Sequence, residues 1–230
     1  MTESTWWHQH EVLCNEVTNT IQSFYTWKHV HNYVSGNKAA LTEMNRNPTF
    51  WNISTHALQT TFIITIGRVF DKDQRSHSIQ KLLAEMAAHP EYFSRASLER
   101  RKREAARGGD VSWLPDYLRD VWEPRTADLE GLRDELNPTI EKYGEIYQPI
   151  RHKMFAHNDI AVDISVLLSK SLITDVEKIL YELHDMLEAV WQLYMNGREP
   201  RLGQQKYDYE ERISETTRRV MSSLTISGER

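Results

Sequence analysis

Hydrophobic residues in this chain recur at three- and four-residue steps, the spacing that gathers side chains on one face of an α-helix. Residues 5–34 carry the first such pattern, and Ser35-Gly36 supplies a stop signal. A polar turn from Asn45 to Pro48 leads into residues 49–70. This second segment is apolar on most sides, which predicts that it is the central buried helix.

Shorter helices are predicted in the middle of the chain. Ser78 fits the cap of a helix over residues 79–88, which ends at His89-Pro90. Two further helices are expected to open at Pro124 and Pro138, because proline is favoured in the first helical turn. Between these segments, residues from about 91 to 124 look like a helical insertion into a four-helix arrangement.

The last long pattern begins at Thr174, whose spacing to Glu177 matches a capping box, and ends at Gly197. Beyond it, residues 198–230 hold one amphipathic candidate that docks on the core, docks on a second subunit or stays mobile. The prediction is therefore an all-α antiparallel bundle over residues 1–197. The C-terminal extension, residues 198–230, is expected to be partly helical or mobile.

Composition narrows the class of protein. The 230 residues are 40% hydrophobic and include seven tryptophans, which excludes wholesale disorder. A net charge of −5 argues against a chain that coats nucleic acid indiscriminately. The single cysteine, Cys14, fits a reducing compartment. The longest apolar run, Phe62-Ile63-Ile64, is too short to cross a bilayer, and no leader is evident, so we expect a cytoplasmic protein without membrane contact.

Charged and titratable residues crowd onto one apolar helical pattern near residue 150. The stripe of that helix runs through Tyr143, Ile146, Tyr147, Ile150, Met154 and His157. Arg151 lies at its edge, about 120° around a straight helix from His157, so the two side chains would not meet within one chain. They can converge if the helix ends near His157 or if a second copy faces it. Pro149 predicts a kink that re-aims Arg151.

Taken singly, His157 is an ordinary core histidine and Arg151 an ordinary surface charge. Together, arginine followed by a polar residue, four more residues and histidine resembles the signature of the HEPN superfamily of helical domains. The segment from Arg151 through Ala156-His157 to Asn158-Asp159 resembles its AbiU-like abortive-infection branch. Gly67-Arg68-Val69-Phe70-Asp71 resembles the same branch. The resemblance spans the first helix to Gly197.

The resemblance implies a HEPN-like bundle and a metal-independent endoribonuclease of toxin or phage-defence type. Such enzymes cleave RNA to a 2′,3′-cyclic phosphate and a 5′-hydroxyl, at a composite site in a homodimer. Histidine suits the proton transfers and arginine the phosphate. Arg151 and His157 would be catalytic, with His152 as helper to the phosphate or the tautomer. The expected substrate-binding residues are Lys153, Asn158 and Arg68.

We expect RNA rather than DNA as substrate, no metal or cofactor, and restraint by an antitoxin or another regulatory partner protein. Ordinary alternatives remain for two of these residues: Lys153 as an exposed lysine and Arg68 as a helix-terminus cation. The basic run at residues 100–103 is either a solvated helix face or an electrostatic handle for phosphates.

Two other functions stay open. The first is a catalytically inactive dimer that binds RNA or a protein through the same groove. The second is a metal hydrolase using His152 and His157, which are badly aligned on one helix face. The sequence has no glycine-rich phosphate loop, no defensible Ser-His-Asp grouping and no cysteine cluster, so nucleotide hydrolysis and nucleophilic catalysis have little support.

Overall fold

The computed structural model describes residues 1–73, 75–152 and 171–226, and the regular secondary structure within these ranges is helical. The helices of the N-terminal half are α1 (Glu3–Ser35), α2 (Lys38–Arg46), α3 (Pro48–Val69), α4 (Ile79–Ala88), α5 (Arg95–Ala105) and α6 (Leu114–Tyr117), with 3-10 turns at Pro90–Phe93 and Leu118–Asp120. They are followed by α7 (Thr126–Glu135), α8 (Asn137–Lys142), the π-helical turn η3 (Tyr143–Tyr147), α9 (Gln148–Ile150), α11 (Ile173–Asn196) and α12 (Tyr209–Ile226).

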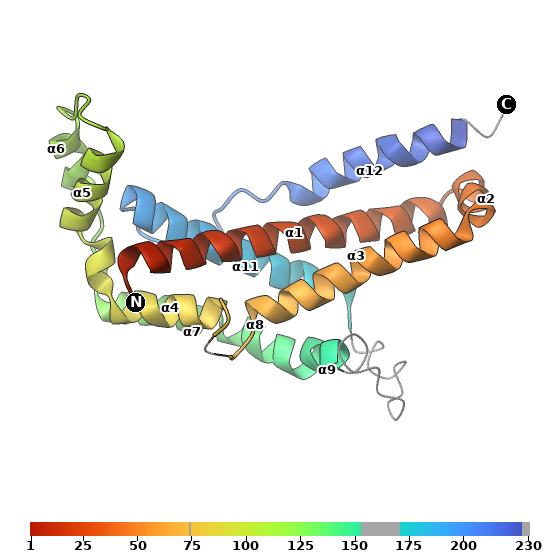
Figure 1. The fold of residues 1–230 in the computed structure, drawn as a ribbon, viewed down its shortest axis with the longest axis horizontal. Coiled ribbons are helices and arrows are strands. Elements are labelled where there is room, and N and C mark those ends of the chain that lie inside the picture. Colours follow the sequence, from red (N-terminus) through yellow and green to blue (C-terminus); the bar gives the residue numbers. More distant parts are fainter. Residues whose placement is uncertain (74, 153–170, 227–230) are drawn as a thin grey trace.

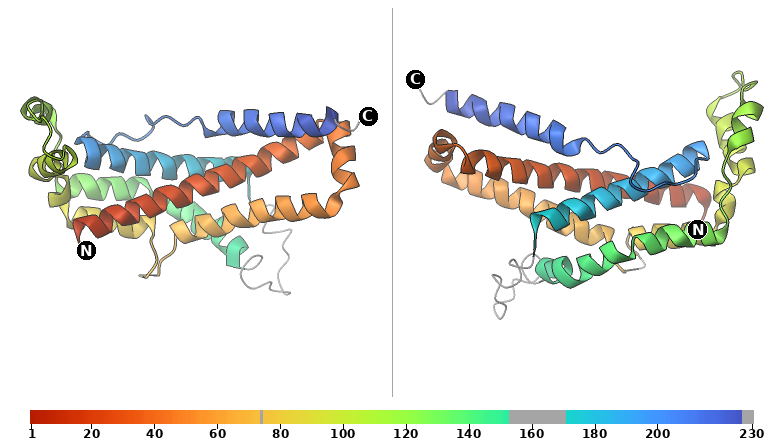
Figure 2. Two further views of the ribbon diagram at one scale, coloured as in Figure 1. Left: turned by 45° about the horizontal axis from the view of Figure 1, so that its top comes forward. Right: turned by 180° about the vertical axis from the view of Figure 1, so that it is seen from behind.

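Helix α1 is the axis of the molecule. It runs side by side with α3, to which α2 connects it, and it also packs against α12, α11 and α4 (Figures 1 and 2). Helices α4, α7, α8 and α9 form a second layer beneath it, while α5 and α6 project at the end near the N-terminus (Figure 1). The predicted all-α fold is confirmed.

Aromatic side chains fill the core between α1 and its neighbours. Trp6 is fully buried, and its indole nitrogen donates to the Leu82 carbonyl of α4 at 3.1 Å. Trp7 stacks on Tyr194 of α11 with 4.4 Å between ring centroids. These tryptophans are therefore packing residues that tie α1 to α4 and α11.

Two predictions for the N-terminal half are wrong. The turn predicted from Asn45 to Pro48 is partly helical, because Asn37 caps a further helix, α2, that extends to Arg46. Helix α3 is also not buried throughout, since Phe50 and Ile53 are 62% and 65% exposed. Only its C-terminal half is buried, because its first half lies along α1 and α2 with its outer face exposed.

The capping box at Thr174 is wrong as well, although the helix itself is present. Helix α11 begins at Ile173 without a side-chain cap. The two carboxylates in its first turns contact lysines of other helices instead. Asp175 pairs with Lys142 at 2.5 Å, and Glu177 pairs with Lys28 of α1. Its end at Gly197 is confirmed, with the residue in the left-handed conformation at φ 60°.

The C-terminal helix docks on the bundle. Helix α12 packs along α1, burying Thr217 and Met221 while Val220 stays 56% exposed. Lys28 contacts Glu210 of α12 at 2.6 Å as well as Glu177 of α11, so one lysine joins three helices.

His10 makes stability depend on pH. Its ring is buried, its Nε2 lies 2.9 Å from the Leu187 carbonyl, and it stacks on Trp7. Burial lowers the pKa of His10 from its usual value of 6.5, although the Leu187 carbonyl and the charges of Glu11 and Glu188 oppose that shift.

A folded-state pKa below the unfolded one means that the unfolded chain binds more protons between the two values. The stability that neutral His10 contributes is therefore present above pH 6.5 and is lost as the pH falls below it. We expect the free energy of unfolding, measured with urea from pH 7.5 to 5, to fall less steeply in His10→Gln than in the wild type. Identical slopes would contradict this prediction.

Candidate active site around Arg151

Arg151 packs directly against the backbone of α3. Its Nη1 donates to the Gly67 carbonyl over 3.4 Å, a long hydrogen bond. A Cβ added to Gly67 would lie 2.2 Å from Arg151 Cδ and 2.6 Å from Nε. The side chain thus occupies the space that a methyl group on residue 67 would fill.

The π-helical turn η3 accommodates Pro149, where the sequence predicts a kink. Proline has no N–H and would clash with the carbonyl four residues back in a regular α-helix. Here the Gln148 N–H already donates to the Tyr143 carbonyl, one residue further back than in an α-helix. In the predicted apolar stripe, Tyr143, Tyr147 and Ile150 are buried and Ile146 is partly buried, whereas Met154 and His157 lie outside the described residues.

The same turn brings Tyr143 and Arg151 onto one face. Eight residues of regular α-helix would set their side chains about 80° apart. A π turn absorbs one residue, which reduces the difference to about 20°. Tyr143 also stacks on Phe70, at the end of α3, with 4.7 Å between ring centroids.

The Tyr143 hydroxyl stays protonated. Burial raises its pKa, the nearby charge of Arg151 opposes that rise, and Asp71 adds to it. Tyr143 Oη and Arg151 Nε are both buried, and neither makes a hydrogen bond of regular geometry within the residues that the structure describes, although Arg151 is near enough to Tyr143 to lower its pKa. A neutral phenol and the buried Nε of a partly exposed guanidinium therefore lie near each other at the end of α3.

The other expected site residues are only partly placed. His152 follows Arg151 and is exposed. Arg68 reaches toward α1, where its Nη2 lies 2.7 Å from Glu16 Oε2, so the structure does not bring it to Arg151. Lys153, His157 and Asn158 lie outside the described residues.

Sequence reasoning missed the contact that Gly67 and Tyr143 make with Arg151. A glycine inside an apolar helical pattern is a signal of close approach, because glycine costs helix stability. Tyr143 was expected in the buried stripe. Its position on the same face as Arg151 depends on the π turn, which hydrophobic periodicity does not predict.

The basic run of α5 is mostly engaged within the protein. Arg101 is 87% buried as a side chain, contacts Glu3 at 2.5 Å and the carbonyls of Tyr92 and Tyr194 at 2.8 Å, and stacks over the Tyr194 ring. Arg100 also pairs with Glu3, and Arg103 pairs with Glu99. Arg101 is therefore neither part of a solvated helix face nor available to bind phosphates. It joins the insertion to α1 and α11.

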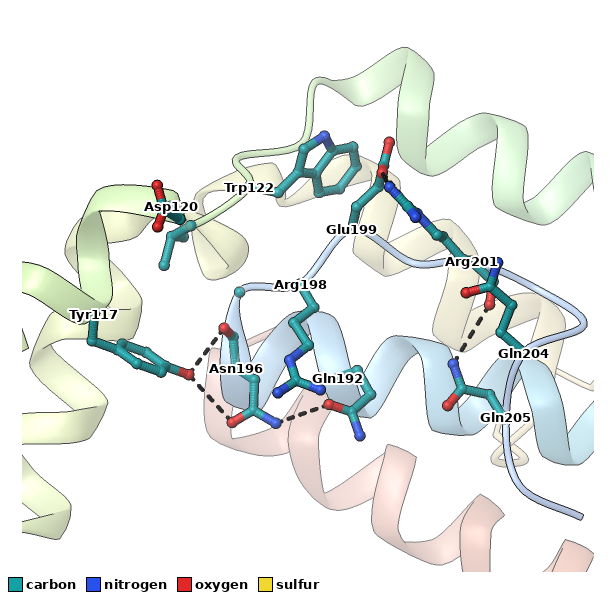
Figure 3. A pocket seen from close by; sticks show the side chains of 12 residues that line it. Tyr117, Asp120, Trp122, Gln192, Asn196, Arg198, Glu199, Arg201, Gln204 and Gln205 are labelled. Atoms are coloured by element: carbon teal, nitrogen blue, oxygen red, sulfur yellow. Dashed lines mark hydrogen bonds and ion pairs between the residues drawn. The ribbon is translucent and has the colours of Figure 1, made fainter.

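A polar pocket of about 690 Å³ lies where the insertion meets the end of α11 (Figure 3). Tyr117 Oη donates to the Asn196 carbonyl at 3.0 Å, and Asn196 Nδ2 donates to Gln192 at 2.9 Å. Arg201 pairs with Glu199 on its rim. Arg151 lies near the opposite end of α11, where Tyr147 Oη donates to the Leu172 carbonyl. The pocket is therefore separate from the candidate site.

Cys14 is not a reactive thiol. Burial raises its pKa to about 12, with Glu188 and Glu11 adding to the rise, so the sulfur stays protonated. In the described parts of the chain, His, Cys, Asp and Glu side chains form no group of three or more that could hold a metal ion. None of the described helices is long and apolar enough to cross a membrane.

Comparison with known proteins gives one match. Residues 6–216 match a HEPN family described as AbiU2, which covers most of the chain and runs into α12. No curated protein and no solved structure matches the chain.

The role found for Arg101 predicts a large difference between neighbouring arginines. Arg101→Ala removes one of the two arginines that pair with Glu3 and the donor to the Tyr92 and Tyr194 carbonyls, so it should lower the free energy of unfolding by about 3 kcal/mol. Arg103→Ala, which removes an exposed pair within α5, should change it by less than about 0.5 kcal/mol. Urea titrations of both variants measure this, and equal losses would refute the assignment.

Proposed function

Because the chain belongs to the AbiU2 family of HEPN domains, we propose that it is a metal-independent endoribonuclease of toxin or phage-defence type. The observation that carries the proposal is the seating of Arg151 against Gly67 and beside Tyr143. Burying the Nε–H of an arginine without a hydrogen-bond partner is costly, and a fully exposed side chain would have avoided that cost. Its retention next to His152 and six positions before His157 favours a catalytic use.

The proposed reaction is transesterification within RNA. A neutral histidine takes the proton from a ribose 2′-hydroxyl, and that oxygen attacks the adjacent phosphorus. The bond from phosphorus to the 5′-oxygen breaks, and a protonated histidine gives that oxygen its proton. The products are a 2′,3′-cyclic phosphate and a 5′-hydroxyl. Arg151 stabilises the charge that builds on the phosphate oxygens.

Acid and base roles require two histidines, and we assign both to His157, one from each chain of a homodimer. Each chain would also contribute Arg151. His152 would assist the phosphate or fix the His157 tautomer. The site is then composite, and a single chain would be inactive.

Lys153, Asn158 and Arg68 are proposed to bind the RNA. Arg68 is held by Glu16 in an ion pair whose arginine is 54% exposed. Exposed pairs of this kind contribute only about 0–1 kcal/mol, so an RNA phosphate can displace the Glu16 carboxylate at little cost.

The alternative is a catalytically inactive dimer that binds RNA or a partner protein. It shares the fold and differs only in the chemistry of the site. Either protein would act in the cytoplasm, and the ribonuclease would need an antitoxin or another regulatory partner to restrain it.

RNA-end mapping tests the proposal. Purified wild-type protein incubated with total RNA in excess chelator should create new 5′-hydroxyl and 2′,3′-cyclic phosphate ends. Arg151→Ala and His157→Ala should lower that rate by at least about 1,000-fold while light scattering still reports dimers. Arg103→Ala is the matched control, and it should cleave like the wild type.

Three results count against this function. Activity that disappears with chelator points to the metal hydrolase. Unchanged cleavage by His157→Ala removes the proposed chemistry. RNA binding by the wild type without new ends favours the inactive dimer.

A further inference from the structure

We propose that Gly67 and Tyr143 are positioning residues that hold the Arg151 guanidinium in a single orientation. We call the contact surface that Gly67 and Tyr143 form for the Arg151 side chain the seat. The effect of the seat on catalysis rests on the proposed ribonuclease function, whereas the seat itself is a property of the fold. The proposal follows from two independent contacts, one with the backbone of α3 and one within the helix that carries Arg151.

Gly67 is the first wall of the seat. It is buried near the C-terminal end of α3, where alanine would favour the helix. A Cβ at this position would lie within 3.0 Å of three Arg151 side-chain atoms, Cδ, Nε and Cζ. Glycine therefore allows the arginine to lie flat on the helix backbone, and any larger residue would push it away.

Tyr143 is the second wall. The π turn sets its ring on the same face as Arg151, and Phe70 stacks on that ring and fixes its plane. Because burial keeps the phenol neutral, it presents an oxygen with lone pairs near the guanidinium.

These two walls decide which donors of Arg151 remain for a ligand. Nη1 donates to the Gly67 carbonyl, and Nε is buried against Gly67. The second N–H of Nη1 and the two N–H groups of Nη2 are then the donors that we assign to a ligand. A scissile phosphate would therefore meet one fixed edge of the guanidinium, which specifies the direction of approach.

Gly67→Ala tests the first wall without threatening the helix. The clash falls on the flexible end of Arg151, so α3 forms and the guanidinium moves. We expect kcat for RNA cleavage to fall on the order of 100-fold with KM changed less than threefold, because misplacement by about 1 Å has an effect of that size. Gly131→Ala in α7 is the matched control, since a Cβ there meets nothing within 4 Å. It should raise Tm and leave kcat unchanged.

A readout independent of cleavage separates this inference from the proposed function. Gly67→Ala should raise Tm more in an Arg151→Ala background than in the wild type, because the obstructing side chain is absent. Equal Tm shifts in both backgrounds overturn the seat, whatever the RNA does. Coupled Tm shifts with no cleavage by any variant, wild type included, keep the seat and overturn the ribonuclease.

Tyr143→Phe tests the second wall, since it removes only the hydroxyl and keeps the stack on Phe70. It should lower kcat about tenfold with KM changed less than threefold, and combining it with Gly67→Ala should lower kcat by less than the product of the single effects. Multiplicative losses would show that the two residues do not act through the same guanidinium, which contradicts the proposal.

Discussion

The close approach of Arg151 to the backbone of α3 at Gly67 is the constraint on which the candidate site depends. An arginine can lie there only because residue 67 has no side chain and because the π turn before Pro149 aims residue 151 at it. The helix that carries Arg151 is in turn fixed to the start of α11, through Lys142 with Asp175 and through Tyr147 with the Leu172 carbonyl. The π turn before Pro149 and the absence of a side chain at Gly67 together allow the Arg151 guanidinium to pack on α3.

The rest of the molecule supplies rigidity through charged groups that join helices. Glu3 receives Arg100 and Arg101 from the insertion, and Lys28 joins α1 to α11 and α12. Arg100 and Arg101 belong to the basic run that the sequence would suggest for nucleic-acid binding, yet both pair with a carboxylate of the protein itself. A basic run is therefore weak evidence for RNA binding when carboxylates and tyrosines from other helices lie within reach.

Periodicity predicted most helices because their buried faces are continuous over several turns, as in α11, and local signals such as Ser78 and Gly197 marked ends well. It failed where another helix determines the outcome. The first half of α3 is apolar yet leaves Phe50 and Ile53 exposed, and Glu177 binds Lys28 instead of capping its own helix. The pattern around Arg151 singled out a residue that packs on α3, but the packing itself did not follow from the pattern, because the contact between Gly67 and Arg151 joins positions 84 residues apart.

Nitrogen-15 NMR of the Arg151 Nε–H group tests the central claim most directly. If the guanidinium is held against Gly67, its Nε–H signal, assigned by its loss in Arg151→Lys, should exchange with water at least about tenfold more slowly than the signal of an exposed arginine such as Arg107, because burial shields it. The signal should also be single, as expected for one orientation. An Arg151 Nε–H that exchanges as fast as that of Arg107 would show a solvated, mobile side chain and would contradict the account.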